Sequence, residues 1–415
     1  MSLMQDSISN AAPAPSMQPP VVVVATILRA DGTTGVHTHV REFLRHLDAV
    51  GQPYHLVTPL SRSPGLATLL FAPRVALSRL SQPLAVLWYR YWHRLFLSAA
   101  LRRLLASLPH AVVYAQSPEA AAAALRARSG RQQRVVMAVH FQGSQADGWQ
   151  EKGDIKPGSI TARRIKDSET RIISELDGLL YLSESARDNL IASHPEADYV
   201  ASEIVHNFVA SPPNHGRTNL VGDLVTVGGL DSHKNHKFLI DVLATIKARG
   251  RDLTLDLFGT GPCETELRRQ AISLGVAHQV RFQGFRSDVR RHLPHYRLYV
   301  HASRTEVGPL AIIEAMAAGL PIVAGKVGGI AEFLTDGFEG RFWSLSDPES
   351  AATTLLELLD DEKAIRAASA AASERFATQF DAATVAPGLL SFLIHGPHRL
   401  LSTAASTTPA AGLDR

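Results

Sequence analysis

The amino-acid sequence predicts an α/β protein with two Rossmann-like halves, each built on a parallel sheet. Short runs rich in Val, Ile and Leu alternate with segments whose apolar residues recur at helical spacing, which is typical of βαβ units. A cluster of turn formers at 211–216 interrupts this alternation, which then begins again. At 415 residues with 45% hydrophobic content, the chain is long enough to fill two cores.

The first half opens with a predicted buried strand at 21–27. A loop rich in Gly and Thr follows, and the apolar residues between 36 and 47 then recur at the spacing of a helix. Further strands of this half are predicted at Tyr54–Thr58, Ala111–Ala115, Arg134–Val139 and Leu179–Ser183.

The second half repeats the alternation without a convincing internal sequence repeat. Its strands are predicted at Leu224–Gly228, Leu253–Phe258, Val280–Gln283, Leu298–His301 and Ile322–Ala324. In sheets of this kind, ligands bind at the carboxyl ends of the strands, and the two halves can face each other across a cleft. The loops that follow the strands are therefore the places where functional residues are expected.

Bulk properties exclude several kinds of protein. The single cysteine, Cys263, cannot form an internal disulfide, so a reducing cytoplasmic setting is expected. The net charge of +3 is mild, and we expect no nucleic-acid partner. We also expect no spanning helix, because no run reaches 18 apolar residues, and no signal peptide. The protein is predicted to be cytoplasmic, with peripheral contact at the cytoplasmic face of the membrane.

Glu306 and Glu314 flank the start of a predicted helix, with seven residues between them. Pro309 is favoured at the first helical position and Gly319 at the stop, so the helix should run over about 309–318. Its first amides lack intrahelical partners and form an anion site. The two carboxylates lie about 12 Å apart along the chain axis, which suits a sugar on one side of a diphosphate and a ribose on the other. A solvated helix with two surface acids is the alternative.

Three more strand-end motifs accompany this segment and each contains glycine. They are 227–235 with Lys234, 258–262 with Gly259 and Gly261, and 325–329. Each glycine allows close approach of the backbone to a ligand, although one such turn alone is more often an ordinary tight turn. Lys234 precedes a predicted helix and can meet a diphosphate, where one unit charge at 4 Å is worth roughly 4 kcal/mol at an effective dielectric of 20.

On these motifs the chain resembles family 4 of the retaining nucleotide-sugar glycosyltransferases. That family has the GT-B fold, in which two Rossmann-like domains with parallel sheets face each other across an interdomain cleft. The resemblance is most specific over 224–340 and looser over 21–392. It implies that Glu306 contacts the donor sugar near the reacting carbon, that Glu314 binds the ribose, and that Lys234 binds the diphosphate.

The resemblance extends to the first half. Gly35, in the Thr34-Gly35-Val36 turn, resembles the family's glycine loop beneath the diphosphate. His140, after the strand that ends at Val139, resembles a histidine that contacts the transferred sugar, and it joins Glu306 as a predicted catalytic residue. The remaining predicted donor contacts are Gly308, Leu310 and Ala311 for the diphosphate, and Gly259 and Gly261 for the nucleotide.

The resemblance also implies a domain organisation. Residues 21–210 form the acceptor-side domain and 211–380 the nucleotide-sugar donor domain, while a last helix within 381–401 packs back toward the first domain. The segments 1–20 and 402–415 have too little apolar content to fold and are predicted to be disordered tails.

The chain departs from the family pattern at two positions next to the predicted diphosphate site. Gly229 stands where members commonly have an arginine, so the diphosphate depends more heavily on Lys234. Pro309 removes one amide donor from the predicted diphosphate site.

No cofactor and no metal ion are expected, since the nucleotide sugar is a substrate. The sequence contains no Asp-x-Asp triplet, the usual carboxylate cradle for a divalent cation on a nucleoside diphosphate. The charge of the leaving group must then be met by Lys234 and backbone dipoles. The histidine pairs His37 with His39 and His233 with His236 are interpreted as surface residues, not metal ligands.

The acceptor side is indicated by a segment without acids between Asp48 and Glu119. Arginines and aromatic residues share its 62–103 region, which suits an anionic membrane surface or a lipid diphosphate. The alternative is a helix pair whose arginines extend around the core. Asp147 and Trp149, in the segment after His140, are predicted acceptor-side residues.

Together these features predict a retaining hexosyltransferase that uses a nucleoside-diphosphate sugar and a glycan or lipid-linked acceptor, in polysaccharide or glycoconjugate biosynthesis. A sugar-nucleotide epimerase on the same scaffold remains an alternative, as does a non-catalytic sugar-nucleotide-binding protein. A nicotinamide dehydrogenase is disfavoured, because no Gly-x-Gly-x-x-Gly follows the first strand.

Overall fold

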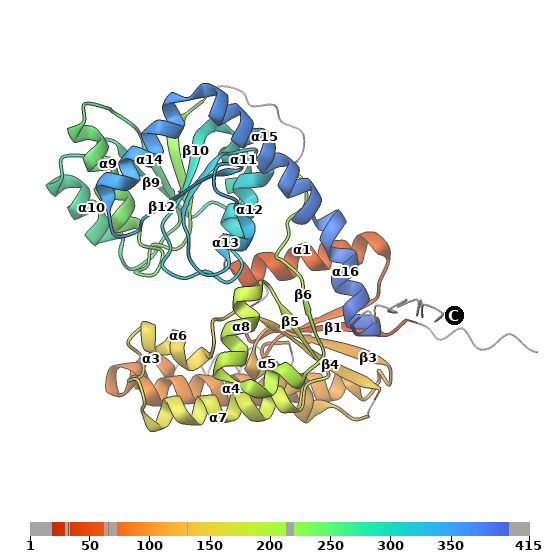
Figure 1. The fold of residues 1–415 in the computed structure, drawn as a ribbon. Helices are drawn as coiled ribbons and strands as arrows, with labels where there is room; N and C mark the ends of the chain where they lie inside the picture. The colour runs from red at the N-terminus through yellow and green to blue at the C-terminus, as the bar shows by residue number, and fades with distance from the viewer. Residues whose placement is uncertain are drawn as a thin grey trace, which may run out of the picture.

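A computed structural model describes residues 19–29, 32, 34–61, 65, 73–130, 132–212 and 220–397. The predicted tails therefore lie outside the described residues, apart from 19 and 20, as does most of the turn cluster at 211–216. Figure 1 shows two α/β domains, and the two sheets confirm the predicted fold class.

The N-terminal domain contains a six-stranded sheet in the order β2-β1-β3-β4-β5-β6, with parallel pairing throughout. Its strands are β1 Val21–Ala25, β2 Tyr54–Val57, β3 Ala111–Ala115, β4 Gln133–Val139, β5 Gly178–Tyr181 and β6 Ser202–Ile204. Central strands such as β3 are buried along their whole length, which explains their continuous apolar composition.

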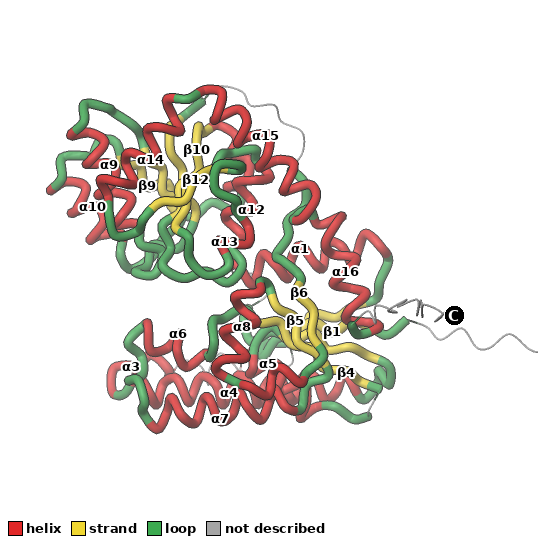
Figure 2. The backbone as a smooth tube through the Cα atoms, in the orientation of Figure 1, coloured by secondary structure: helices red, strands yellow, loops and turns green. Residues whose placement is uncertain are grey.

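The C-terminal domain contains a second six-stranded parallel sheet in the order β12-β11-β10-β7-β8-β9. Its strands are β7 Gly222–Val227, β8 Leu255–Phe258, β9 Val280–Gly284, β10 Tyr296–His301, β11 Ile322–Gly325 and β12 Gly340–Trp343. Figure 2 shows loops that follow these strands on the side of the domain nearest its neighbour.

Helices cover both faces of each sheet. Those of the N-terminal domain are α1 Gly35–Val50, α3 Pro73–Leu80, α4 Gln82–Leu105, α5 Pro118–Ala127, α6 Gln145–Glu151, α7 Ile160–Ser174 and α8 Glu184–Ser193. Those that follow are α9 His236–Ala248, α10 Glu264–Ser273, α11 Val289–His292, α12 Leu310–Ala317, α13 Ile330–Phe333, α14 Pro348–Asp360, α15 Glu362–Gln379 and α16 Ala382–His395. Short 3-10 helices occur at Pro195–Tyr199 and Leu293–His295.

The last helix, α16, belongs to the core of the first domain. Leu389 and Phe392 are fully or almost fully buried in the same cluster as Val22 and Val136 of the first sheet. Helix α16 also contacts α1, and Figure 1 shows it beside the N-terminal domain. One face of the first sheet is thus covered by the beginning and the end of the described chain.

The chain crosses between the domains twice, and the two crossings are hydrogen-bonded to each other. The Val209 amide donates to the Phe380 carbonyl at 3.1 Å, and the Ala382 amide donates to the Val209 carbonyl at 3.0 Å. A side-chain hydrogen bond from Ser211 to Asp381 lies alongside. The connection between the domains is therefore a pair of segments, not a single linker.

The strand predictions at ten places are matched by observed strands, but two strands were not predicted. Strand β6 has only three residues and none of them is buried. Strand β12 lies at the end of its sheet and carries an exposed Arg341. Short edge strands lack the apolar run that marks a central strand.

Candidate functional site

Glu306 lies in the loop between β10 and α12, where two hydrogen-bond donors of its own domain contact its carboxylate. Lys234 Nζ is 2.5 Å and His301 Nε2 is 3.0 Å from the same oxygen, Oε1. The Glu306 side chain is only 11% exposed. The sequence prediction named Glu306 and Lys234 but missed His301, the last residue of β10.

The electrostatics of this cluster keep Glu306 charged. Burial by itself raises the pKa of Glu306, but Lys234 and His301 outweigh it and hold the pKa well below its usual range. Burial lowers the pKa of His301, although Glu306 partly opposes this. At neutral pH the cluster is therefore a carboxylate, an ammonium group and a neutral imidazole that donates through Nε2.

Lys234 reaches Glu306 from the turn between β7 and α9. Its amide donates to Asp231 Oδ1 at 3.2 Å, and Asn235 adopts a left-handed conformation with φ of 54° just before the helix. An ammonium group has three donors, so the contact with Glu306 leaves two for a diphosphate. Lys234 can thus contact the Glu306 carboxylate and a bound diphosphate at the same time.

Two helix N-termini meet beside this cluster. A Cβ atom added to Gly35, the first residue of α1, would lie 3.4 Å from Leu310 Cδ1, and Leu310 is the first residue of α12. The first amides of each helix have no intrahelical acceptor, which favours an anion between them. The predicted diphosphate residues Gly35, Leu310 and Ala311 are therefore brought together by the fold.

Helix α12 begins one residue later than predicted. Pro309 is the N-cap, with ψ of 85°, and the helix runs over Leu310–Ala317. The prediction placed Pro309 inside the first turn, but the extended ψ shows that the chain has not yet entered the helix there. Pro309 lacks an amide N–H, but it lies before the helix, so the first amides of α12 are all present.

Glu314 lies one turn into α12 and is partly buried. Burial raises its pKa to about 7, while Arg290 and Arg41 act in the opposite direction and Glu42 reinforces the rise. Glu314 therefore changes charge near neutral pH, unlike Glu306. Ribose hydroxyls are neutral donors, and a carboxylate accepts from them better than a carboxylic acid does.

The N-terminal domain holds the backbone of the Glu306 loop through two side-chain amides. Gln142 Nε2 donates to the Glu306 carbonyl and Asn207 Nδ2 donates to the Gly308 carbonyl, both at 2.7 Å. Val307 packs against the apolar core of the first domain between these two bonds. A Cβ atom at position 308 would lie 2.8 Å from Asn207 Nδ2, so glycine is required for this approach.

Asn207 is itself fixed by a buried chain of hydrogen bonds. His39 Nδ1 lies 2.9 Å from Asn207 Oδ1, and His39 Nε2 lies 2.7 Å from the Tyr114 hydroxyl. Since Asn207 donates to Gly308, its oxygen must accept, so His39 donates from Nδ1 and Tyr114 donates to Nε2. Burial lowers the pKa of His39 to about 4, which keeps this neutral tautomer. The interpretation of His39 as a surface residue is wrong, because it is fully buried. His236 is also buried, at 3% exposed.

His140 stands at the carboxyl end of β4, next to the same chain. Its Nε2 lies 2.9 Å from Gln116 Oε1, and its ring centroid is 5.2 Å from that of His39. Burial, with a smaller contribution from His39, lowers its pKa well below the ordinary value, so His140 is neutral. Its predicted contact with the sugar stays a prediction.

Gly259 and Gly261 have a structural reason that the sequence prediction did not include. A Cβ atom at Gly259 would lie 1.9 Å from the Gly228 carbonyl oxygen, and one at Gly261 would lie 2.3 Å from the Leu230 carbonyl oxygen. The loop after β8 thus packs backbone to backbone against the loop after β7. Close packing of two loops explains these glycines without a ligand, and their role in nucleotide binding stays a prediction.

The predicted acceptor-side residues lie on α6. Asp147 caps this helix by accepting from the Ser144 amide at 3.1 Å, and it pairs with Lys166 at 2.9 Å. The Trp149 ring lies 6.2 Å from the ring of Tyr89 on α4. Both residues have partners inside the N-terminal domain, and their contact with an acceptor stays a prediction.

Part of the arginine-rich 62–103 segment faces the protein interior. Arg90 is buried and pairs with Glu119 at 2.6 Å, and Arg94 donates to Ser168 at 3.3 Å. For these two residues the alternative of arginines around the core is correct. Arg62 and Phe71 lie outside the described residues, while Arg102 and Arg103 are exposed.

Among the described residues, no group of three or more His, Cys, Asp and Glu side chains is arranged to hold a metal ion. Within the same part of the chain, no helix is both long enough and apolar enough to cross a membrane.

Two family models match the chain, one on each half. The model described as Glycosyl transferase 4-like domain matches residues 34–202, and the model described as Glycosyl transferases group 1 matches residues 217–375. The second match contains Lys234, Glu306 and Glu314.

Well-described proteins with similar sequences share about a quarter of their residues with this chain over the matched part. The glycogen synthase of Mycobacterium tuberculosis is 27% identical over 242 residues, which cover 54% of this chain and 56% of that protein. A GDP-mannose-dependent monoacylated alpha-(1-6)-phosphatidylinositol monomannoside mannosyltransferase of Corynebacterium glutamicum is 27% identical over 263 residues, or 58% of this chain and 66% of that one. The match thus spans little more than half the length of the glycogen synthase.

Solved structures share the fold. Sucrose-phosphate synthase of Thermosynechococcus elongatus superposes with a TM-score of 0.70 at 17% identity, covering 90% of this chain and 97% of that one. An Anabaena protein in complex with UDP and glucose superposes with a TM-score of 0.67 at 16% identity, covering 91% and 99%.

Proposed function

Because the chain belongs to the family 4 type of glycosyltransferase with the GT-B fold, we propose that it transfers a sugar from a nucleoside-diphosphate sugar to an acceptor hydroxyl. The acceptor is a glycan or a lipid-linked molecule, and the sugar is a hexose. The observation that carries the proposal is the buried Glu306 carboxylate, held by Lys234 and His301 where the N-termini of α1 and α12 meet.

The charges of this cluster match the charges of the reaction. The C1–O bond to the diphosphate breaks while the acceptor oxygen bonds to C1, and positive charge develops on the sugar ring as negative charge develops on the departing oxygen. In this proposal Glu306 stabilises the positive charge on the sugar, and Lys234 with the helix amides stabilises the negative charge on the departing oxygen. The acceptor attacks C1 from the same face from which the diphosphate departs, so the anomeric configuration is retained. Its proton passes to the departing phosphate oxygen, so no protein nucleophile is needed.

The N-terminal domain contributes neutral groups to this proposal. His140 contacts the sugar as a hydrogen-bonding group, since a neutral imidazole adds no charge beside the developing cation. Glu314, one turn after the start of α12, binds the ribose. Binding energy from these remote contacts orients the sugar for attack.

A screen of nucleotide sugars tests the proposal without knowledge of the acceptor. Binding would be measured by calorimetry and slow hydrolysis by release of the nucleoside diphosphate. We expect one donor to bind clearly more tightly than the others and to be hydrolysed slowly with its configuration retained, as read by NMR of the released sugar. If no nucleotide sugar binds at millimolar concentration, the proposal is wrong.

Transfer is proposed to proceed without a metal ion, because the sequence lacks an Asp-x-Asp triplet and Lys234 offers a fixed charge. Turnover is expected to persist after exhaustive chelation. Loss of activity with EDTA and its return with Mg²⁺ or Mn²⁺ would contradict this part of the proposal.

Peripheral contact with an anionic membrane is supported by the exposed Arg102 and Arg103 and by the exposed apolar residues Leu80, Leu84 and Tyr91 on the same helix pair. Co-sedimentation with anionic vesicles, weakened by salt, is the expected result. If the protein sediments equally with neutral vesicles, or does not sediment with anionic vesicles at all, this segment has no role at an anionic membrane.

A further inference from the structure

Helix α13 makes a carboxylate contact across the domain boundary. Its Glu332 accepts from the first two amides of α8 in the other domain, with Oε2 2.7 Å from the Glu184 nitrogen and Oε1 2.8 Å from the Ser185 nitrogen. The third amide, of Ala186, donates to the N-cap Ser183 at 3.1 Å. A negative charge is favoured at this end of a helix, because the first amides lack intrahelical acceptors. Both domains thus cap the start of α8 together.

Glu332 is also fixed within its own domain. Arg375 of α15 donates from Nη2 to the Glu332 carbonyl at 2.7 Å. The ring of the next residue, Phe333, lies 4.9 Å from the ring of Phe380 and 4.8 Å from that of His206, measured between centroids. Phe380 and His206 lie at or near the two crossings of the chain between the domains. The carboxylate therefore meets α8 from a fixed base, and the contact sets the distance between α13 and α8.

The segment that leads into α13 supports the Glu306 loop. The Gly329 amide donates to the Glu306 carbonyl at 2.9 Å, beside the bond from Gln142. A Cβ atom at Gly328 would lie 2.2 Å from that carbonyl oxygen, and one at Gly329 would lie 2.3 Å from the Val307 carbonyl oxygen. The loop before α13 therefore packs backbone to backbone against the loop before α12. By holding α13, helix α8 also holds the loop that leads to the first amides of α12.

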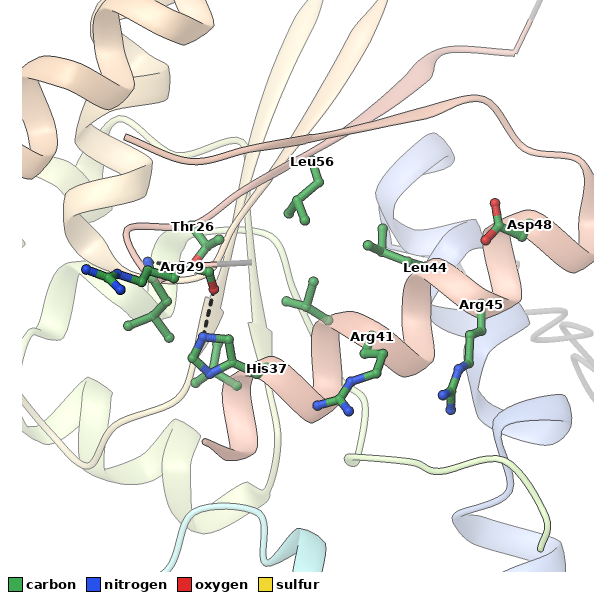
Figure 3. Close-up of a pocket in the computed structure, with 11 residues that line it drawn as sticks. Thr26, Arg29, His37, Arg41, Leu44, Arg45, Asp48 and Leu56 are labelled. Carbon is green, nitrogen blue, oxygen red and sulfur yellow. Dashed lines mark hydrogen bonds between the residues drawn. The ribbon is translucent and has the colours of Figure 1, made fainter. Parts of the chain in front are cut away.

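The other half of the predicted diphosphate site, the start of α1, is fixed to the first domain. The Thr34 amide donates to His37 Nδ1 at 3.2 Å, and His37 Nε2 donates to the Arg29 carbonyl at 2.8 Å. Figure 3 shows the second of these bonds. Gly35 at this helix start approaches Leu310 of α12. The anion site between α1 and α12 therefore exists only while the two domains stay in contact.

We propose that Glu332 is a positioning residue, whose contact with α8 holds the first amides of α1 and α12 at the spacing that a donor diphosphate bridges. Without the contact, the domains separate in the free protein, and the donor must bring them together again. The apparent dissociation constant then rises as the paired form becomes less populated, whereas the rate with donor bound changes little. This inference rests on the proposed function and assigns to its donor site a residue that does not touch the donor.

Removing the charge of Glu332 tests the proposal. Glu332→Gln keeps the size of the side chain but turns an NH2 group toward one of the two α8 amides, so that contact is lost. We expect the dissociation constant for UDP or GDP, measured by calorimetry, to rise about tenfold. Hydrolysis at saturating donor should stay within about twofold of the original rate. Glu357→Gln, at an exposed glutamate on α14, is the matched control and should change neither.

Two results of this measurement would overturn the proposal. Unchanged affinity in Glu332→Gln would show that the contact does not hold the donor site together. A lower rate at saturating donor with unchanged affinity would show a loss of folded protein, which thermal unfolding would report independently, and not a loss of position.

The other side of the contact can be changed without touching the second domain. Glu184→Pro removes the amide that donates to Glu332 Oε2, and proline is favoured at the first position of a helix. Glu184→Ala keeps that amide and is the matched control. The proline variant should weaken UDP or GDP binding as Glu332→Gln does, and the double variant no more than the weaker-binding single one, since both changes break one contact. Additive losses, or an equal loss in Glu184→Ala, would overturn the proposal.

Distances between spin labels report whether the domains separate. Labels are attached at Arg163→Cys on α7 and Thr265→Cys on α10, both exposed, in a Cys263→Ser background. Glu332→Gln should broaden the distance distribution in pulsed electron paramagnetic resonance, and saturating UDP or GDP should restore the original one. An unchanged distribution together with weaker binding would mean that Glu332 contacts the ligand itself, and would overturn the positioning role.

The outcomes also separate this inference from the proposed function. If a nucleotide sugar binds and is hydrolysed equally well with Glu332 and with Gln at this position, the proposed function stands and the inference is wrong. If the original protein binds no nucleotide sugar, the proposed function is wrong. The role of Glu332 at a donor site is then wrong as well, even where the label distances respond to Glu332→Gln.

Discussion

Two buried polar clusters face the domain boundary, and they differ in charge. In the C-terminal domain, Glu306, Lys234 and His301 form a charged cluster. In the N-terminal domain, Tyr114, His39 and Asn207 form a neutral chain that is more deeply buried. One cluster can stabilise charge that appears during a reaction, and the other can only fix geometry. The difference suggests a division of labour, in which the second domain supplies electrostatics and the first supplies position.

Removing the charge of the first cluster is the most severe test of this comparison. Glu306→Gln keeps the size of the side chain but cannot stabilise a developing cation, so we expect the transfer rate to fall by about 10²- to 10³-fold. Donor binding, measured by calorimetry, should change far less than the rate. Full activity in this variant would end the assignment of Glu306.

Breaking the neutral chain should have a smaller effect. Asn207→Asp is isosteric but cannot donate to the Gly308 carbonyl, and we expect about a tenfold lower kcat with little change in donor KM. His39→Asn keeps a donor near the Nδ1 position and should retain more activity than His39→Leu. Circular dichroism and thermal unfolding serve as controls, because a loss of kcat that merely follows a loss of folded protein would contradict a positioning role.

The smallest effect concerns pH and separates Glu314 from the neutral histidines. With a pKa near 7, Glu314 becomes a carboxylate as pH rises, so nucleotide affinity should increase several-fold between pH 6 and 8. His39, with a pKa of about 4, does not titrate in this range. Glu314→Gln is expected to bind more weakly at pH 8 and to lose the pH dependence, as measured by titration with the nucleoside diphosphate. A dependence that survives in Glu314→Gln would assign it to another group.

The same shift makes a prediction for stability. Because the pKa of Glu314 is raised above its ordinary value in the folded protein, the folded state binds the proton more tightly than the unfolded state does. The contribution of Glu314 to the free energy of unfolding therefore falls as pH rises from the ordinary value of 4.5 to about 7. Glu314→Gln should raise the melting temperature more at pH 8 than at pH 5.

The sequence predicted those parts of the site that depend on local patterns. Strand ends, glycine turns and the start of α12 are visible as runs and breaks, so Glu306, Lys234 and Gly35 could be selected before the structure was known. His301 was missed because a histidine that ends a strand has no local mark of function. Asn207 and His39 are 168 positions apart and meet only in the fold. For Arg90 the sequence left a membrane surface and the core as alternatives, because its partner Glu119 lies outside the helix that carries it.

The doubly crossed connection has a consequence for how this protein is made. Helix α16 completes the core of the first domain, yet it is synthesised after the entire second domain. At about 5–20 residues per second, the first sheet waits roughly 10 to 35 s between the synthesis of Val209 and that of Ala382 with one face partly uncovered. During this interval the nascent chain exposes the apolar surface that α16 later covers.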